Sequence, residues 1–211
     1  MEPTRHETKI KNMELKIEDN FIRFELVPLI FQQKNLSGIF FNKNNKSLKE
    51  TLQHRRYVKF HNLFLNKYSD HLDQGLGDFL KHLKESNDQN YLTFLNSYGD
   101  HKFCEFKIEK NLNDKGIYCF IQDDEIKYIG RCNDSFGKRV NQGYGKIHPK
   151  NCFIDGQTTN CHINSLVNSN DNTKFGIYIM NDKSREEISN LEKLILINYK
   201  FEWNIQNQKN R

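Results

Sequence analysis

Two tyrosines, each close to a glycine, mark the part of the chain best suited to chemistry. Tyr118 ends a Gly-Ile-Tyr run and Tyr128 begins a Tyr-Ile-Gly run. Because glycine weakens a strand, its presence in a β-rich run indicates close approach of a backbone or ligand. The stretch from Lys127 to Lys150 holds one acidic residue, Asp134, and six cationic ones: Lys127, Arg131, Lys138, Arg139, Lys146 and Lys150. This concentration of positive charge beside the tyrosines favours contact with phosphates.

A β-hairpin and a helix are the elements expected to position these side chains. Residues 116–121 and 126–130 are β-rich runs separated by an acidic, polar turn, which predicts two antiparallel strands. Asp134 or Ser135 can cap a following helix that presents Arg139. The two glycines and the proline of residues 142–149 then end that helix.

The last third of the chain predicts one more strand and one more helix. Residues 174–180 form an apolar run and contain a second Gly-Ile-Tyr tripeptide, which no Tyr-Ile-Gly follows. We therefore interpret this tripeptide as part of a core strand. A capping box formed by Ser184 and Glu187 begins an amphipathic helix that carries Glu192.

The first half of the chain contains no independent motif. Apolar and polar residues alternate early in residues 1–45, so strands, or one strand and a helix, are possible. Helical spacing with a Ser47–Glu50 capping box begins at Ser47, and further helices are expected over about 69–85 and 89–97. Residues 103–108 predict a strand. We place a domain boundary at the polar loop of residues 111–114. This boundary gives an N-terminal extension (1–111), which could serve DNA recognition or dimerisation, and a catalytic domain (112–211).

Five sequence elements, taken in order, resemble the GIY-YIG nuclease superfamily. They are the two tyrosine runs at 116–118 and 128–130, Arg139, Glu192 on its helix, and the late Asn204. The resemblance covers about half of the chain. It implies an α+β fold whose core is a small three-stranded antiparallel sheet flanked by helices, here joined to a mostly helical N-terminal extension.

The resemblance also implies how the side chains share the hydrolysis of a phosphodiester bond. Tyr118 would act as general base or position water, and Tyr128 would orient water or the scissile phosphate. Arg139 would bind a phosphate oxygen, since its planar fork suits phosphate. Glu192 would hold one hydrated Mg²⁺, which Mn²⁺ is expected to replace, and Asn204 would brace the site. The accessory His or Tyr of the family falls at Gly143 here, so Tyr144 is the first choice for that role and His148 the second.

Contacts with DNA are predicted from charged and amide-rich side chains near this site. The predicted cationic set is Lys127, Arg131, Lys138, Lys146 and Lys150, and the predicted amide, hydroxyl and imidazole set is Gln157, Thr159, Asn160, His162 and Asn164. Such groups suit phosphates and base edges, and they equally suit an ordinary turn with a capped helix. Arg55 and Arg56 could also read DNA, but a solvated helix face is the simpler interpretation.

Composition limits the remaining possibilities. No run of eighteen apolar residues occurs and residues 1–7 lack the core of a secretory signal, so the expected location is the cytoplasm, with no membrane partner. Five cysteines without a CxxC pair indicate reduced thiols. A structural zinc site at Cys152, Cys161 and His162 is a weaker alternative, because paired ligand spacing is missing.

The sequence therefore predicts a Mg²⁺-dependent type II restriction endonuclease, a site-specific deoxyribonuclease that cuts double-stranded DNA at a short sequence. A palindromic target would call for a homodimer, with one active site for each strand. The alternatives are a homing, mobile-element or repair endonuclease of the same superfamily, or a catalytically silent DNA-binding protein on the same scaffold.

Overall fold

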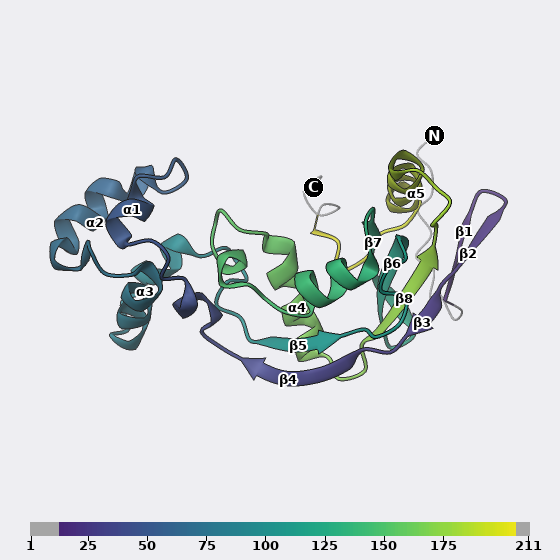
Figure 1. Cartoon of the computed structure of the whole chain (residues 1–211), viewed down its shortest axis with the longest axis horizontal. Coiled ribbons are helices and arrows are strands. Elements are labelled where there is room, and N and C mark those ends of the chain that lie inside the picture. Colours follow the sequence, from purple (N-terminus) through teal and green to yellow (C-terminus); the bar gives the residue numbers. More distant parts are fainter. Residues whose placement is uncertain (1–12, 206–211) are drawn as a thin grey trace. The chain divides into compact units, whose positions relative to one another are not determined.

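The computed structural model describes residues 13–205 (Figure 1), and the expectation about a signal at residues 1–7 lies outside them. The described chain divides into two compact units. Unit 1 comprises residues 13–32, 106–145 and 169–205, and unit 2 comprises residues 33–105 and 146–168. This division is discontinuous along the chain, whereas the sequence suggests one boundary near residue 111, which stays a prediction.

Unit 1 is built from strands with two helices. Its elements are β1 (Glu14–Ile17), β2 (Asn20–Arg23), β3 (Glu25–Val27), β6 (Gly116–Gln122), β7 (Glu125–Cys132), the π-helix η5 (Lys138–Tyr144), β8 (Lys174–Ile179) and α5 (Arg185–Asn198). Two further strands, β4 (Ile30–Leu36) and β5 (Phe103–Lys107), pair with each other, and the division between the units falls within both. The predicted α+β class is thus confirmed.

The central sheet of unit 1 has four strands in the order β3-β8-β6-β7, all antiparallel. The prediction of three strands is therefore wrong. The fourth strand is β3, whose Leu26 lies opposite Gly176 of β8. Pairing between residues so distant in sequence has no local signal, so the sequence pattern alone does not place β3 in this sheet. Residues 14–36 contain four strands, which is one of the two possibilities that their alternating pattern left open, and helices begin at η1.

The predicted hairpin is formed by β6 and β7. Asp123 and Asp124 both have positive φ (51° and 60°), as a two-residue type I′ turn requires. A register shift opposite Phe120 and Ile121 leaves Lys127 as an extra residue, a β-bulge. Because of this bulge, Tyr128 lies opposite Phe120 and on the same face of the sheet as Tyr118.

Both faces of β6 are buried, for different reasons. One face belongs to an apolar cluster that includes residues of β1, β2 and α5: Leu15, Ile17, Ile22, Ile117, Cys119, Ile121, Ile129, Ile188 and Ile195. Side chains alternate along a strand, so Tyr118 and Phe120 lie on the opposite face. That face is lined by aromatic rings, among them Phe136, Tyr144 and Phe175.

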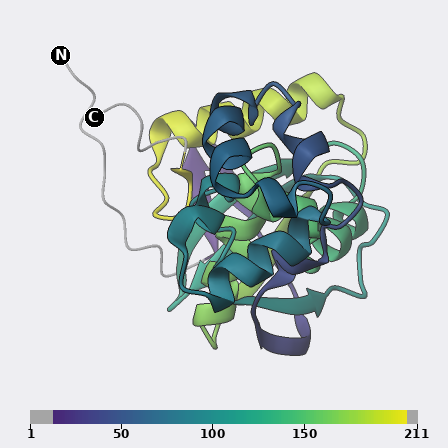
Figure 2. The same ribbon diagram turned by 90° about the vertical axis from the view of Figure 1, so that its left-hand side faces the viewer.

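Unit 2 consists mainly of short helices, of which Figure 2 gives a second view. They are η1 (Ile39–Asn42), α1 (Leu48–Leu52), η2 (Val58–Phe60), α2 (His61–Lys67), η3 (Ser69–His71), α3 (Leu76–Glu85), η4 (Gln89–Phe94), η6 (Pro149–Cys152) and α4 (Thr158–Ser169). The helix predicted from Ser47 begins there as α1, and the Ser47–Glu50 capping box is confirmed, with Glu50 N–H donating to Ser47 Oγ at 3.2 Å. The helix predicted over 69–85 is divided into η3 and α3, and the one predicted over 89–97 is the 3₁₀ helix η4. They are shorter than their periodicity suggests. Gly75 stands at the N-cap of α3.

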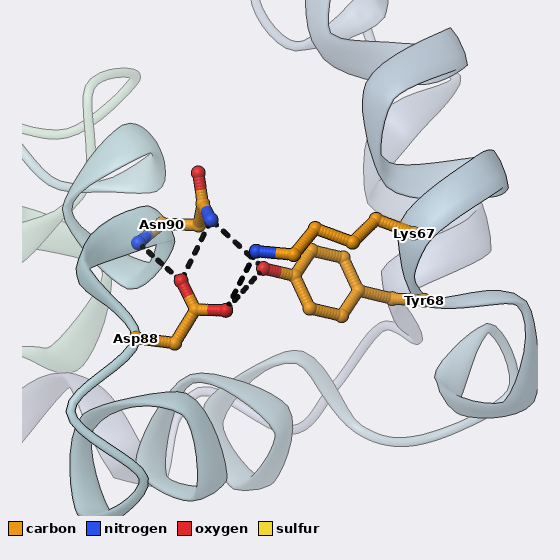
Figure 3. A network of polar contacts seen from close by, with 4 residues as sticks. All are labelled: Lys67, Tyr68, Asp88 and Asn90. Atoms are coloured by element: carbon orange, nitrogen blue, oxygen red, sulfur yellow. Dashed lines mark hydrogen bonds and ion pairs between the residues drawn. The ribbon is translucent and has the colours of Figure 1, made fainter.

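A polar network joins the helices of unit 2 at their surface (Figure 3). The Tyr68 hydroxyl donates to Asp88 Oδ2 at 2.6 Å, and Lys67 Nζ donates to the same oxygen at 2.9 Å. Asp88 also accepts the backbone N–H of Asn90 at 3.0 Å, which caps η4. Every charge in this network therefore faces an opposite charge or a donor.

The five cysteines all lie in the described part of the chain and are buried free thiols, as predicted. Cys152 and Cys161 lie with their sulfurs 4.0 Å apart. Among the described residues no group of three or more His, Cys, Asp or Glu side chains could hold a metal, so the zinc alternative gains no support. None of the helices between residues 13 and 205 has the length and apolar character that crossing a membrane needs.

Candidate active site

Three phenols and one guanidinium meet on one face of the unit 1 sheet. The Tyr118 hydroxyl of β6 lies 2.8 Å from the Tyr144 hydroxyl of η5, and the Tyr128 hydroxyl of β7 lies 3.1 Å from the same atom. Arg139 Nε donates to the Tyr118 hydroxyl at 3.0 Å. We call these four residues the phenol cluster. The structure thus brings together four of the seven predicted catalytic residues.

Glycine at position 130 makes room for this arrangement. Tyr118 and Gly130 are opposite each other in the β6–β7 register. A Cβ atom at residue 130 would lie 2.4 Å from the Tyr118 hydroxyl oxygen, closer than such atoms can approach. Gly116, at the start of β6, has φ of +147°, and a Cβ there would lie 2.1 Å from the Tyr178 carbonyl oxygen. Both glycines therefore permit close approach, as expected from the sequence.

The helix that carries Arg139 is a π-helix. Ser135 Oγ accepts the Lys138 N–H at 3.3 Å, so Ser135 is the predicted cap. Gly145 N–H donates to Val140 O, five residues earlier, at 2.6 Å. The π-helix places residues i and i+5 on one face, and π-turns are frequent at functional sites. Arg139 accordingly lies over the Tyr144 ring, with its Cζ 5.1 Å from the ring centroid.

Burial dominates the electrostatics of the phenol cluster. Tyr118 and Tyr144 are fully buried, and Tyr128 is 7 % exposed. Burial raises the pKa of all three phenols, while the positive charge of Arg139 lowers each pKa by a smaller amount. The phenols are therefore protonated at neutral pH, with a cation beside them that would stabilise a phenolate.

Glu192 of α5 lies beside the cluster and pairs with a second arginine. Its Oε2 accepts a hydrogen bond from Arg131 Nη1 of β7. The negative charge of Glu192 contributes to the raised pKa of Tyr128, so the carboxylate lies within electrostatic range of that phenol. Arg131, predicted to contact DNA, is thus occupied by the predicted metal ligand. The Ser184–Glu187 capping box, with Glu187 N–H donating to Ser184 Oγ at 3.2 Å, begins α5 as expected.

Asn204 holds the backbone of β7. Its Oδ1 accepts the Ile129 N–H at 2.9 Å, and its Nδ2 donates to Ile129 O at 2.8 Å. The side-chain amide thereby replaces a neighbouring strand along the outer edge of β7. Because Ile129 directly follows Tyr128, Asn204 fixes the strand that presents a phenol of the cluster.

His148 and most of the predicted DNA-contacting residues belong to unit 2, whereas the phenol cluster belongs to unit 1. His148 belongs to unit 2, where its Nδ1 accepts the Lys150 N–H at 3.2 Å and caps η6. Lys127 Nζ donates to Glu125 and Glu202 at 3.1 and 3.0 Å. Four of the predicted DNA-contacting residues are exposed and belong to unit 2: Lys146, Lys150, Gln157 and Thr159. Lys138 is exposed on η5.

Three residues predicted to contact DNA are buried within unit 2, on α4. They are Asn160, His162 and Asn164, with exposed fractions of 4, 9 and 0 %. Asn164 holds Cys104 as Asn204 holds Ile129, with Cys104 N–H donating to its Oδ1 at 2.8 Å and its Nδ2 donating to Cys104 O at 2.7 Å. The Asn164 side chain, used in this way, is not available to a base edge, and burial limits the access of DNA to Asn160 and His162.

A magnesium ion at this site would rest on few protein ligands. Glu192 is a carboxylate of the type that Mg²⁺ prefers, and its side chain retains 14 % exposure. Mg²⁺ keeps several waters and takes substrate oxygens, so one carboxylate fits such an ion. Arg131 already places a cationic group on this carboxylate, which indicates that the position accepts positive charge.

Comparisons with protein families, with curated proteins and with solved structures found no match for this chain. The site must therefore be judged on its own geometry. That geometry offers hydroxyl groups that can hold water, a guanidinium that can bind an anion, and a carboxylate that can hold a cation.

Proposed function

We propose that the chain is a Mg²⁺-dependent endonuclease that hydrolyses phosphodiester bonds of double-stranded DNA at a short specific sequence, as a type II restriction enzyme does. The observation that carries this proposal is the convergence of Tyr118, Tyr128, Tyr144 and Arg139 in one hydrogen-bonded cluster. These residues come from three elements of unit 1. The proposal also relies on the sequence resemblance to the GIY-YIG nucleases.

Arg139 is the residue that would bind the scissile phosphate. It is partly exposed, whereas Tyr118 and Tyr144 are fully buried. A phosphate would therefore meet the guanidinium first, and its terminal amino groups can donate two parallel hydrogen bonds to phosphate oxygens. Movement of Arg139 toward the phosphate would break its bond to Tyr118 and open that hydroxyl to water.

Tyr118 would then position the attacking water. A phenol oxygen has lone pairs that accept a hydrogen bond, and its own proton can be donated to Tyr144, 2.8 Å away. The charge of Arg139 opposes the effect of burial on the pKa of Tyr118, so the guanidinium would stabilise a Tyr118 phenolate that could accept a proton from the attacking water. Tyr128, whose hydroxyl is hydrogen-bonded to that of Tyr144, would complete a connected series of three hydroxyl groups.

Glu192 would hold the metal ion, and Asn204 would support the site from β7. When bound, Mg²⁺ supplies positive charge that polarises the phosphate and stabilises the leaving oxygen. Glu192 must first release Arg131, which could then contribute its charge to a nearby phosphate. Asn204 touches only the Ile129 backbone, so its role is positioning.

Two alternatives remain as separate proposals. A homing, mobile-element or repair endonuclease would use the same cluster on a different DNA substrate, and a catalytically silent DNA-binding protein would not use its chemistry at all. A homodimer with two active sites would suit a palindromic target. Cytoplasmic location fits the restriction hypothesis, because invading DNA is met there.

Digestion of plasmid and phage DNA tests the proposal. With Mg²⁺ we expect discrete fragments whose ends map to one short sequence, and with EDTA we expect intact DNA. A smear would contradict site specificity, and cutting confined to nicked or damaged duplexes would favour repair. Intact DNA with Mg²⁺ or Mn²⁺, on substrates carrying all short sequences, would leave the silent DNA-binding protein as the better hypothesis.

A further inference from the structure

A second group of cationic side chains lies around the loop of residues 153–155 in unit 2. Lys43 follows η1, Lys46 precedes α1, and Lys150 lies in η6. Burial lowers the pKa of Lys43, and so do the charges of Lys46 and Lys150, while the charge of Asp155 raises it. Arg56 reaches the same loop, where its Nη1 donates to Ile154 O at 2.7 Å. We call Lys43, Lys46, Arg56 and Lys150 the Lys43 cluster.

Backbone contacts hold two members of the Lys43 cluster in place. Gly77 N–H donates to Lys43 O and Leu76 N–H donates to Lys46 O, each at 3.0 Å, at the beginning of α3. The Lys43 ammonium lies 4.7 Å from the centroid of the buried Phe153 ring. The half-buried ammonium is therefore fixed by a cation–π contact on a rigid loop.

The charges in the Lys43 cluster are not balanced. Asp155 is the acid that acts on Lys43, and its Oδ1 accepts a hydrogen bond from the Tyr57 hydroxyl at 2.5 Å. Within residues 13–205, none of the four cationic side chains forms an ion pair. Lys43 thus lies within electrostatic range of two further cations, Lys46 and Lys150, and of one carboxylate, Asp155, so a bound anion would relieve the repulsion among the lysines.

We propose that the Lys43 cluster binds the phosphate backbone of double-stranded DNA. The identity of the partner rests on the proposed function, whereas the charge imbalance does not. Lysines act as point charges on phosphates, and duplex DNA supplies such charges at close, regular spacing. Gln157 and Thr159, which follow Asp155 closely in the chain, are exposed and carry groups that contact phosphates and base edges. Lys43, Lys46 and Arg56 thereby join the predicted contact Lys150.

The test measures DNA binding without catalysis. Affinity for a fluorescent duplex of random sequence is measured by anisotropy in EDTA over a series of KCl concentrations. The exposed pair Lys46→Ala/Lys150→Ala is compared with Lys81→Ala, a matched control on the exposed face of α3. We expect the pair to bind about tenfold or more weakly, and its plot of log affinity against log salt to become shallower by about 0.9 for each phosphate that the variant no longer neutralises. The control should match the wild type.

Two kinds of outcome would overturn the proposal. Unchanged affinity and slope in the pair, with thermal unfolding like that of the wild type, would exclude the cluster from DNA binding. Failure of the wild type to bind duplex DNA, or tighter binding to RNA or polyglutamate, would exclude this partner. If the pair unfolds early, Lys46→Gln/Lys150→Gln replaces it. A wild type that cleaves DNA while the variants bind normally contradicts only this inference, and one that binds through the cluster without cleaving contradicts only the proposed function.

Discussion

Both units contain a tyrosine whose hydroxyl is hydrogen-bonded within a network that holds a cation, but only one network contains an acid that neutralises the cation. In unit 2, Tyr68 and Lys67 both donate to Asp88 (Figure 3). In unit 1, Arg139 donates to Tyr118, a neutral phenol. Within the described part of the chain Arg139 forms no ion pair. The charge of Lys67 is thus neutralised by Asp88. The charge of Arg139 is not neutralised within its network, and it suits an incoming anion.

This difference separates a network that stabilises the fold from one that we propose to be reactive. Asp88 gains donors when the chain folds, and Tyr68 and Lys67 hold its pKa well below the usual range. Such contacts stabilise the folded chain, and they leave no unpaired charge to which a substrate could bind. In the phenol cluster, burial instead raises the pKa of each phenol, so three protonated hydroxyls lie beside the Arg139 cation without an acid to neutralise it. Perturbed groups of this kind gather at functional sites.

The largest effect is expected from removing the cation of the phenol cluster. Arg139→Ala should lower the single-turnover rate of DNA cleavage by about 10²–10³-fold, because a group that binds the transition-state phosphate is removed. Lys67→Ala removes a cation from the other network and should leave the rate within about twofold, since surface pairs contribute little. Equal losses in the two variants would show that the networks do not differ as described.

Glu192→Gln should also reduce Mg²⁺-dependent cleavage strongly. We expect a loss of roughly a hundredfold, since a metal ion supplies several kcal/mol to such reactions. Glu186→Gln is the matched control, because Glu186 lies exposed on the same helix. The measurement is the cleavage rate over a range of Mg²⁺ concentrations. A Glu192→Gln variant with unchanged metal dependence would exclude Glu192 as the ligand.

The two asparagine clamps allow a matched comparison of stability. Asn204→Ala and Asn164→Ala each leave a buried N–H and C=O group without their partners, in β7 and β5 respectively. Each substitution should lower the free energy of unfolding by about 1–3 kcal/mol, measured with urea. Only Asn204→Ala should also slow cleavage under conditions where the variant stays folded, because Ile129 follows Tyr128. Slower cleavage in both would indicate that stability alone explains the effect.

A smaller effect, on metal affinity, is expected from removing Arg131, the arginine that pairs with Glu192. Arg131→Ala should tighten Mn²⁺ binding by up to about fivefold, because a competing cation has been removed from the carboxylate. Electron paramagnetic resonance of free Mn²⁺, without DNA, gives the affinity directly. Weaker Mn²⁺ binding in this variant would contradict competition between Arg131 and the metal.

The smallest effect concerns the pH dependence that Asp88 contributes. Its folded pKa is depressed, so its stabilisation is present above the unfolded value of about 4 and is lost as pH falls toward the folded pKa. The difference in urea midpoint between wild type and Asp88→Asn should therefore narrow as pH is lowered from about 5 to about 2. A difference that stays constant over this range would show that Asp88 is not stabilised as a carboxylate.

Local signals predicted most elements of the fold. The Asp123–Asp124 turn, the Ser47 and Ser184 caps and the strand at 174–180 depend on neighbouring residues, and the sequence indicates each correctly. β3 could not be found in this way, because its pairing with β8 is decided by residues about 150 positions away.

Within the candidate site, the sequence indicated the positions of the phenols better than the roles of the amide side chains. The phenol cluster follows from the motif order, and the five-residue interval between Arg139 and Tyr144 suits the π-helix once its geometry is known. Asn164 and Asn204 show why amide side chains were harder to interpret. An asparagine can contact a base edge or substitute for a peptide group of a strand, and residue type alone does not distinguish these uses.

The most direct measurement removes one hydroxyl from each network. Tyr118→Phe and Tyr68→Phe are assayed for cleavage of the same labelled duplex with Mg²⁺, and DNA affinity is measured with Ca²⁺. The account predicts that Tyr118→Phe loses at least about a hundredfold in cleavage rate while binding DNA normally, and that Tyr68→Phe cleaves like the wild type. A Tyr118→Phe protein that cleaves at the wild-type rate would contradict the central claim that the phenol cluster performs the chemistry.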